Sequence, residues 1–108
     1  DGIQQIVEQI KQTPYNKLHL VLGFMKDKDV EKILPLYPQD AQFYFCKPNL
    51  PRAMELALLQ EKAERIGLKY SGIEDVNMAL DYAISMADEG DLILVGGSTF
   101  VVAEIKNL

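Results

Sequence analysis

The sequence has few of the residues that build covalent cross-links and metal sites. Its 108 residues include one cysteine, Cys46, and one histidine, His19. A single cysteine excludes an internal disulfide and is typical of a reducing compartment, so we expect a cytoplasmic location. One cysteine and one histidine are also too few to build a zinc site from these two residue types.

Basic residues are outnumbered by acidic ones, and long apolar runs are missing. Lys and Arg total 11 and Asp and Glu total 16, which gives a net charge of −5 at pH 7. An acidic chain without a basic run is poorly suited to nucleic acid or an anionic membrane, so we expect neither as a partner. No apolar run approaches the roughly 18 residues of a membrane span. No signal peptide is visible at the opening Asp1-Gly2-Ile3-Gln4.

The two common glycine-rich nucleotide motifs are absent. No G-x-x-x-x-G-K-[ST] phosphate loop occurs, and Gly96-Gly97 is too short for the G-x-G-x-x-G dinucleotide fingerprint. With 48% apolar and 25% charged residues the chain is globular rather than disordered, and its 108 residues correspond to one domain with a modest core. An opening without Met indicates a piece cut from a longer protein, although processing gives the same start.

Apolar runs alternate with helical stripes along the whole chain. Stripes of period three to four predict helices, and short continuous apolar runs predict strands. The expected helices are 2–12, 30–34, 52–66, 76–87 and 100–105, and the expected strands are 18–22, 42–46, 68–70 and 92–95. This alternation predicts an α/β fold with a mostly parallel sheet and helices on both faces.

Local signals set the expected boundaries and the expected buried faces. The start and stop signals are Asp1 paired with Gln4, Thr13-Pro14, Asp29 as an N-cap, Pro51 in a first turn, Gly67, the capping-box spacing of residues 71–74, and Gly90. The expected inward residues are Met54, Ala57, Leu58 and Ile66 on one helix and Val76, Leu80, Ala83, Ile84 and Ala87 on the next.

The stretch 91–100 contains the first candidate site. Its four consecutive apolar residues, 92–95, are typical of a strand buried on both faces. Gly96-Gly97 then removes side chains that would keep a ligand from the backbone. Ser98 or Thr99 would cap the next helix, and unpaired N–H groups with the helix dipole would make an anion pocket there. The alternative is a tight turn that binds nothing, and the motif alone does not decide between them.

The loop 23–29 contains the second candidate site, because ligands of parallel sheets lie beyond the carboxyl ends of the strands. Lys28 stands between Asp27 and Asp29. A lysine held by two carboxylates suits an anionic substrate, although a solvated loop with a helix cap is the simpler interpretation of these residues alone. The loop 46–52 is a third candidate.

The two residues with the most reactive side chains are interpreted as structural. His19 lies in the middle of an expected strand, so we expect one satisfied ring nitrogen rather than a catalytic role. Cys46 stands at a strand end, where packing is its expected role.

Three motifs, taken together, resemble a known family. The stretches Leu-Val-Leu-Gly-Phe-Met-Lys-Asp-Lys-Asp at 20–29 and Asp-Leu-Ile-Leu-Val-Gly-Gly-Ser-Thr-Phe-Val-Val-Ala-Glu at 91–104 are similar to the C-terminal domain of folylpolyglutamate synthase/dihydrofolate synthase. Residues 45–53 resemble the middle loop of the same domain. That enzyme belongs to the Mur ligase superfamily, and the resemblance covers essentially the whole chain.

The resemblance implies a Rossmann-like three-layer domain that works within a longer enzyme. In the family this domain follows an ATP-binding central domain that carries the phosphate loop. The family also places an Asp-x-x-His-Asn-Pro motif just before the helix that begins here at about Gly2, and this chain starts too late to contain it. We therefore expect the isolated domain, 1–108, to be inactive and to carry no cofactor of its own.

The activity that the resemblance implies is ATP-dependent amide ligation. ATP would phosphorylate a carboxylate of folate or dihydropteroate, L-glutamate would displace the phosphate, and Mg²⁺ would neutralise phosphate oxygens, largely on the central domain. The C-terminal domain would close over that site and present glutamate.

Within that family pattern, individual positions receive expected roles. Lys28 matches a position suited to an anionic substrate group, with Asp27 and Asp29 orienting it, and Ser98 with Gly97 matches the turn that would hold a glutamate carboxylate. This chain departs from the family by having Gly96 and Cys46 where Thr is frequent. No residue here is a convincing general base.

Two alternatives from other classes stay open. One is another Mur-type ligase, which would add an amino acid to a cell-wall precursor. The other is a non-catalytic α/β binding module, receiver-like in its element order, although no acceptor Asp ends the second or the last expected strand.

Overall fold

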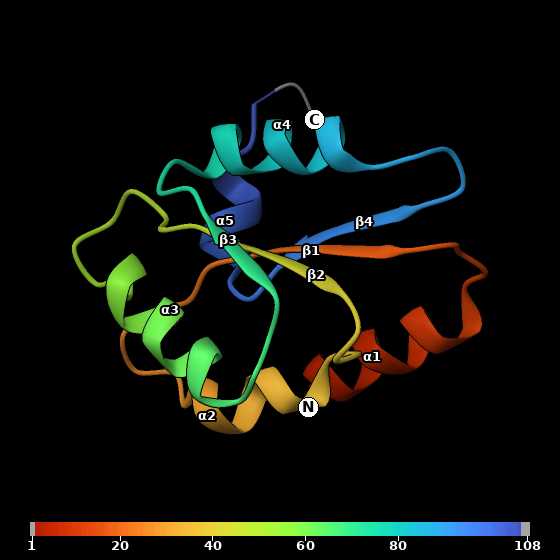
Figure 1. Ribbon diagram of the computed structural model, residues 1–108. Helices are drawn as coiled ribbons and strands as arrows, with labels where there is room; N and C mark the ends of the chain where they lie inside the picture. Colours follow the sequence, from red (N-terminus) through yellow and green to blue (C-terminus); the bar gives the residue numbers. More distant parts are fainter. Residues whose placement is uncertain (1, 107–108) are drawn as a thin grey trace.

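Short apolar strands joined by helical crossovers form one parallel sheet in the computed structural model, which describes residues 2–106 (Figure 1). The helices are α1 Gly2–Gln12, α2 Val30–Ile33, the 3₁₀ helix η1 Leu34–Leu36, α3 Leu56–Arg65, α4 Val76–Met86 and α5 Thr99–Glu104. The strands are β1 Leu18–Leu22, β2 Gln42–Phe45, β3 Tyr70–Gly72 and β4 Leu92–Gly96. The α/β fold class is thereby confirmed.

The strand order creates a crevice at one end of the sheet. The order is β3-β2-β1-β4, and every pairing is parallel, so that Leu20 pairs with Phe43 on one side and Leu94 on the other. The chain moves outward from β1 to β3 and then crosses back to place β4 on the other side of β1. This reversal between β1 and β4 is the topological switch point, where ligands of open parallel sheets bind beyond the carboxyl ends.

The sheet separates two apolar cores. Helices α1, α2 and α3 cover one face, and α4 and α5 cover the other (Figure 1). Consecutive residues of a strand point to opposite faces, so Leu20 packs in the first core and Val21 packs with Val76 and Ala83 in the second. Among the described residues, no helix is long and apolar enough to cross a membrane.

Strand β4 departs from the expectation that it is buried on both faces. All of its residues, Leu92–Gly96, are only partly buried. The reason is its position, because β4 is the last strand in the order and pairs with β1 alone within residues 2–106. The continuous apolar run therefore predicted a strand correctly, but its expected burial on both faces was wrong.

The helix expected over 52–66 begins later, at Leu56. The backbone ahead of it bonds to the loop after β1 instead of forming a first helical turn: Lys26 N–H donates to Arg52 O over 2.8 Å, and Met54 N–H donates to Phe24 O over 2.8 Å. Pro51 consequently lies in a turn rather than in the helix.

The inward face of α3 was also only partly predicted. Met54 is buried as expected, whereas Ala57, Leu58 and Ile66 are exposed. Leu59 and Ala63, one helical turn apart, face the core instead. Gly67 ends this helix as expected, with a φ of 76° that favours glycine.

Three expectations around β3 and α4 need correction. The strand runs over Tyr70–Gly72 rather than 68–70. The expected capping box at 71–74 is wrong, because the cap of α4 is Asp75, whose Oδ2 accepts from Met78 N–H over 2.9 Å. Ile84 is exposed, while Val76 and Ala83 of the same expected stripe are buried. The expected Asp1–Gln4 capping pair lies outside the described residues.

Candidate functional site

The first two candidate loops line one cavity beyond the carboxyl ends of β1 and β4. Its volume is about 460 Å³, and both Lys28 and the turn Gly97-Ser98 contribute to its wall. Loops after β1 and β4 flank the switch point, so the sheet topology explains why residues some 70 positions apart in sequence meet here. Asp27 and Asp29 are not part of the lining.

The expected clamp of Lys28 between two carboxylates is not formed. Within residues 2–106 no hydrogen bond or ion pair joins the Lys28 ammonium to Asp27 or Asp29. Asp29 stands at the N-cap position of α2 without a side-chain capping bond, and its Oδ2 lies 3.9 Å from Lys32 Nζ. Lys28 N–H donates to Met25 O over 3.2 Å, which closes the turn, and the Lys28 side chain makes no hydrogen bond or ion pair with residues 2–106.

Gly97 lines the cavity and has no room for a side chain. Its φ is 86°, and a Cβ at this position would lie 2.5 Å from Gly23 O and 3.1 Å from Phe24 Cε1. The missing side chain thus admits the neighbouring loop. At Gly96, the last residue of β4, a Cβ would find ordinary contacts, 3.7 Å from a Leu94 methyl.

Ser98 is the N-cap of α5, and it is one of the two residues, Ser98 and Thr99, that were expected to cap this helix. Its Oγ accepts from Phe100 N–H over 3.1 Å, and its φ of −152° is that of an extended residue. A serine hydroxyl has one donor besides its acceptor lone pairs. Capping uses only the acceptor side, so the O–H of Ser98 is free to donate to a ligand in the cavity.

The third candidate loop lines a different cavity of about 530 Å³. Lys47 and Glu55 form an ion pair of 2.6 Å, and this hydrogen bond raises the pKa of Lys47 and lowers the pKa of Glu55. Asn49 N–H donates to Glu104 Oε1 over 2.6 Å, which ties the loop to the end of α5. Cys46 is fully buried, and burial raises its thiol pKa to about 12, so its packing role is confirmed.

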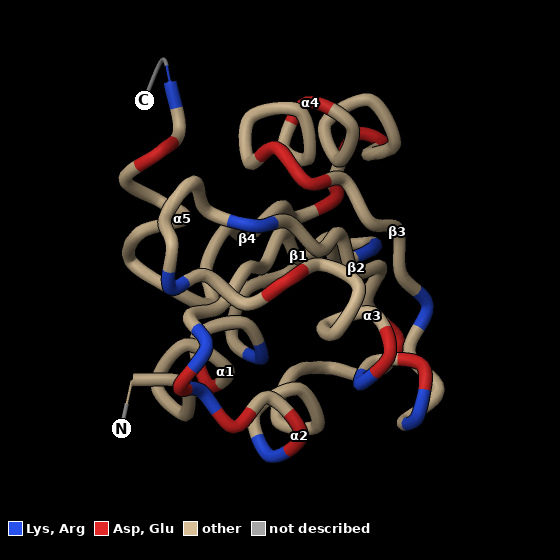
Figure 2. Tube along the Cα trace, turned by 90° about the vertical axis from the view of Figure 1, so that its left-hand side faces the viewer, with Lys and Arg blue, Asp and Glu red and all other residues tan. Residues whose placement is uncertain are grey.

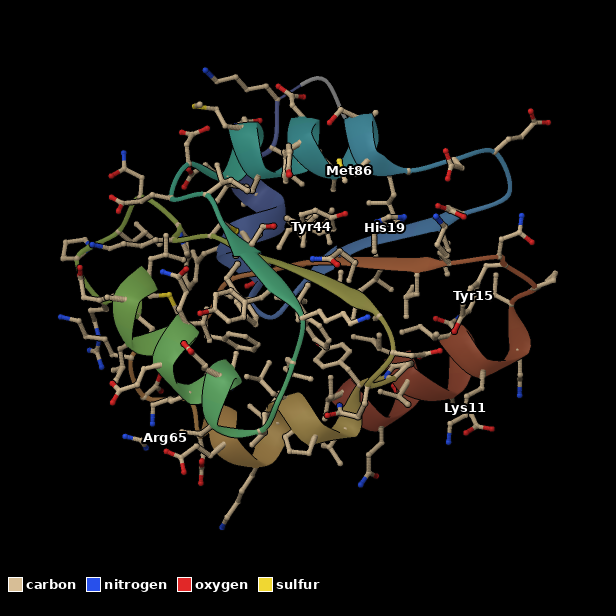
Figure 3. All side chains as sticks on the ribbon, in the orientation of Figure 1. Lys11, Tyr15, His19, Tyr44, Arg65 and Met86 are labelled. Atoms are coloured by element: carbon tan, nitrogen blue, oxygen red, sulfur yellow. The ribbon has the colours of Figure 1, made fainter. Side chains whose placement is uncertain are left out.

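A buried polar network that the sequence analysis missed lies between the sheet and α4 (Figure 3). His19 Nε2 is 2.8 Å from Asp91 Oδ2, and His19 Nδ1 is 2.7 Å from the Tyr44 hydroxyl. His19 is a strand residue as expected, but both of its nitrogens are satisfied rather than one. The sequence did contain a hint of this contact. Asp91 directly precedes the last strand and His19 is the second residue of the first strand, so the two lie close together if these strands are neighbours.

Asp91 is the centre of that network. Its carboxylate also accepts from Asp88 N–H over 2.9 Å and from Lys17 N–H over 3.1 Å, and its side chain is inaccessible to solvent. The bond from the Asp88 amide, followed by the bond from His19, lowers the pKa of Asp91. Asp91 precedes the first residue of β4 and lies at the amino end of the strands, so the network belongs to the edge opposite the 460 Å³ cavity.

The distribution of charged and metal-binding side chains bears on which groups this domain could hold. No group of three or more His, Cys, Asp or Glu side chains in 2–106 is arranged to hold a metal. Figure 2 shows Lys and Arg interspersed with Asp and Glu over helices and loops rather than gathered on one face. The sequence contains no phosphate loop. Among the described residues that line the 460 Å³ cavity, Lys28 is the basic one.

A family model described as "Mur ligase, glutamate ligase domain" matches residues 1–99. The chain belongs to this family. Membership of the Mur ligase family agrees with the resemblance of the three motifs and argues against the receiver-like alternative.

Individual relatives point to two kinds of Mur ligase. The chain is 35% identical to the "Probable bifunctional folylpolyglutamate synthase/dihydropteroate synthase" of Haloferax volcanii over 98% of its own length and 13% of that protein's. It is 32% identical to the UDP-N-acetylmuramoyl-L-alanyl-D-glutamate–2,6-diaminopimelate ligase of Caldanaerobacter subterraneus over 90% of its length and 22% of that protein's.

The fold is shared with a solved structure. E. coli FolC in complex with DHPP and ADP superposes with a TM-score of 0.79 at 25% identity, covering 94% of this chain and 24% of that one. The chain therefore spans between about an eighth and a quarter of the lengths of these relatives.

Proposed function

We propose that this domain is the C-terminal, glutamate-ligase part of an ATP-dependent ligase that adds L-glutamate to folate or dihydropteroate. The observation that carries the proposal is the cavity at the switch point, which Lys28 and Ser98 both line. Family membership and the likeness to folylpolyglutamate synthases support it. A cytoplasmic location is part of the same proposal.

The chemistry of the cavity suits a carboxylate. The Lys28 ammonium supplies a point charge that no described protein group neutralises, and the Ser98 hydroxyl supplies a directed donor. Gly97 fixes the turn that presents Ser98. Asp27 and Asp29 flank Lys28 in sequence and are proposed to orient its side chain when substrate is bound. This domain's contribution would then be to hold the amino acid at the reacting carboxyl group, an effect of proximity and orientation.

ATP and Mg²⁺ are proposed for another domain of the enzyme. The described residues offer neither a metal cluster nor a phosphate loop, so we derive no step through either group on this chain. The ligase domain alone is accordingly expected to be inactive, and its partner in catalysis is the ATP-binding central domain.

Two ligation assays test the proposal and its alternative. A polypeptide carrying this domain behind its natural upstream sequence is supplied with ATP, Mg²⁺ and either dihydropteroate or folate with L-glutamate. The second assay supplies a UDP-muramoyl peptide with diaminopimelate, because the match to the cell-wall ligase covers 90% of this chain. Product with the folate-type acceptor supports the proposal, and product with the muramoyl acceptor alone would replace it with the alternative. The 108-residue chain serves as the control that should form neither product.

A further inference from the structure

Helix α4 carries three large apolar side chains in one exposed row, called the α4 stripe below. Met78, Tyr82 and Met86 are 63%, 41% and 51% exposed, and they follow one another at intervals of four residues. Residues four apart on a helix are neighbours on its surface. Isolated exposed apolar residues are common, whereas a continuous row of methionine and tyrosine is typical of an interaction surface. None of the three lines the 460 Å³ or the 530 Å³ cavity, so the α4 stripe is separate from the candidate ligase site.

Tyr82 is held in place by the buried network under α4. Its ring packs edge-on against Tyr44 with centroids 5.8 Å apart, and the Tyr44 hydroxyl is bonded to His19. A side chain that is fixed at one edge and exposed at the other loses little conformational freedom when a partner binds. Tyr82 is therefore suited to be the central anchor of an interface, a position in which tyrosine is enriched.

The segment from β3 to α5 differs from the rest of the chain in its charge. Residues 70–105 contain no Lys or Arg, although the whole chain has 11. The same segment contains seven of the 16 acidic residues: Glu74, Asp75, Asp81, Asp88, Glu89, Asp91 and Glu104. Figure 2 accordingly shows acidic residues and no basic ones on α4. An acidic surface repels nucleic acid and anionic membranes and attracts a basic partner.

Asp81 places a free negative charge beside the α4 stripe. It stands three residues after Met78, so the two side chains are neighbours on the helix surface. Asp81 is exposed, and its carboxylate forms no hydrogen bond or ion pair within residues 2–106. A Lys or Arg that approaches the stripe would find this carboxylate unpaired. Because a bound partner excludes water from the stripe, such an ion pair is screened less than one in open solvent.

The 530 Å³ cavity continues this surface beyond the first turn of α4. Asp75, the N-cap of α4, lines the cavity together with Glu74 and Glu104. Lys47 is the basic residue among those that line it, and its ammonium is paired with Glu55 over 2.6 Å. The Glu74 carboxylate forms no hydrogen bond or ion pair within residues 2–106. A cavity of this size and charge admits the end of a Lys or Arg side chain.

We propose that the α4 stripe docks a basic amphipathic helix of a partner protein. Apolar side chains of that helix cover Tyr82 and the two methionines, and its Lys or Arg side chains pair with Asp81 and enter the cavity beside Glu74. A second copy of this chain fits less well, because α4 against α4 would bring acidic residues together with no basic residue of 70–105 to offset them. The surface goes beyond the proposed ligase activity and does not depend on it.

The test is a titration of the ¹⁵N-labelled 108-residue chain with a synthetic helical peptide of about 18 residues, or five turns, with Leu on one face and Lys on the other. We expect amide shifts concentrated in residues 75–88. Two matched peptides separate the contacts. One keeps the Leu pattern with Glu in place of Lys, and the other has the same Leu and Lys content in an order without an apolar face. Both should bind at least about 10-fold more weakly, because one meets like charges and the other cannot cover the stripe.

Variants assign the apolar contact to the α4 stripe. Met78→Ser and Tyr82→Ala should each weaken binding of the Leu-Lys peptide roughly 5- to 30-fold, as truncation of a central interface residue does. Leu58→Ser is the matched control, because Leu58 is 43% exposed on α3, which covers the other face of the sheet. It should keep the affinity of the unaltered chain. If Tyr82→Ala does not fold, Met78→Ser still tests the stripe.

A second pair of variants tests the charge. Asp81→Asn should weaken binding at low salt and reduce the dependence of the affinity on salt concentration. Glu8→Gln on α1 removes an exposed carboxylate across the sheet and should change neither. If both variants weaken binding equally, the peptide senses only the net charge of the chain, and the assignment to α4 is wrong.

Several further outcomes overturn the inference. It fails if the Leu-Lys peptide at millimolar concentration shifts no amide of α4, if the Leu-Glu peptide binds as tightly, or if Leu58→Ser weakens binding as much as Tyr82→Ala. Dimerisation of the unaltered chain in sedimentation, abolished by Tyr82→Ala, would replace the partner helix with a second copy. Loss of peptide binding in the longer polypeptide of the ligation assays would mean that another part of that polypeptide covers the stripe. Ligation by that polypeptide without peptide binding rejects this inference and leaves the proposed function standing.

Discussion

Gly97 and Gly23 lie against each other where β4 and β1 end, and neither position has room for a side chain. A Cβ on Gly97 would approach Gly23 O to 2.5 Å, and a Cβ on Gly23 would approach Cys46 O to 2.8 Å. Gly23 N–H also donates to Gly96 O over 3.3 Å. The ends of three neighbouring strands are thus fixed relative to one another by backbone contact, and this contact positions Lys28 and Ser98 around one cavity.

The first prediction is that Gly97→Ala destabilises the domain while Gly96→Ala does not. Gly97 combines a φ of 86° with the contact to Gly23, whereas Gly96 has ordinary contacts and no positive φ. The cost at Gly97 should be about 2 kcal/mol or more, and the change at Gly96 should stay below about 1 kcal/mol. Urea denaturation of both variants measures the difference. Equal urea midpoints for the two variants would contradict the prediction, because they would mean that the loop around Gly23 shifts to accept the new methyl group without loss of stability.

The same glycines show why the site was predicted in part. The sequence placed Gly97, Ser98 and Lys28 at carboxyl ends of strands, because local patterns of apolar runs and turn residues determine where strands stop. It did not reveal that Gly97 serves a contact with Gly23, since that contact joins loops more than 70 residues apart and depends on strand order. A pair of glycines in sequence is equally compatible with a ligand and with a neighbouring chain segment.

Side-chain partners were the least predictable feature. Lys28 was expected between Asp27 and Asp29 because the three are adjacent in sequence, but Lys28 lines the cavity without the two aspartates, and Asp29 lies 3.9 Å from Lys32 instead. The bond of His19 to Asp91 spans 72 positions and arises because β1 and β4 are neighbours in register. Periodicity predicted both strands, and only the pairing of the strands brings the two side chains together.

The second prediction concerns pH. Hydrogen bonds from Asp88 N–H and His19 hold the pKa of Asp91 below its unfolded value. A lowered folded-state pKa contributes stability that is present above the unfolded pKa, about 3.9, and is lost as pH falls through the folded value. The free energy of unfolding should therefore fall as the pH drops below about 4, and less steeply in Asp91→Asn.

The matched control for Asp91 is Asp88→Asn. Asp88 has a side chain that is 73% exposed and pairs with Lys17 on the surface. Urea denaturation at several pH values compares the unaltered chain and the two variants. We expect Asp88→Asn to keep the pH slope of the unaltered chain. A slope unchanged in Asp91→Asn would mean that other carboxylates produce the acid sensitivity.

The third prediction is that Cys46 reacts with thiol reagents only when the domain unfolds. The side chain is fully buried, and burial raises its pKa to about 12, so the reactive thiolate is scarce in the folded state. Labelling with a disulfide reagent at neutral pH should be slow in buffer and rapid in urea. Rapid labelling of the folded chain would show that the end of β2 opens locally, and the packing assignment would then be wrong.

The last prediction concerns Ser98, which has two roles that can be measured separately. In the proposed ligase, Ser98→Ala should lower stability by about 1 kcal/mol, because the cap on Phe100 N–H is lost. It should also raise the KM for glutamate roughly 10- to 150-fold, because the hydroxyl donates to a charged carboxylate. Asp75→Ala removes the equivalent cap of α4 and is the control, with a similar loss of stability and an unchanged KM. If Ser98→Ala behaves like Asp75→Ala in both measurements, Ser98 is a cap alone, and Lys28 becomes the remaining candidate for the glutamate carboxylate.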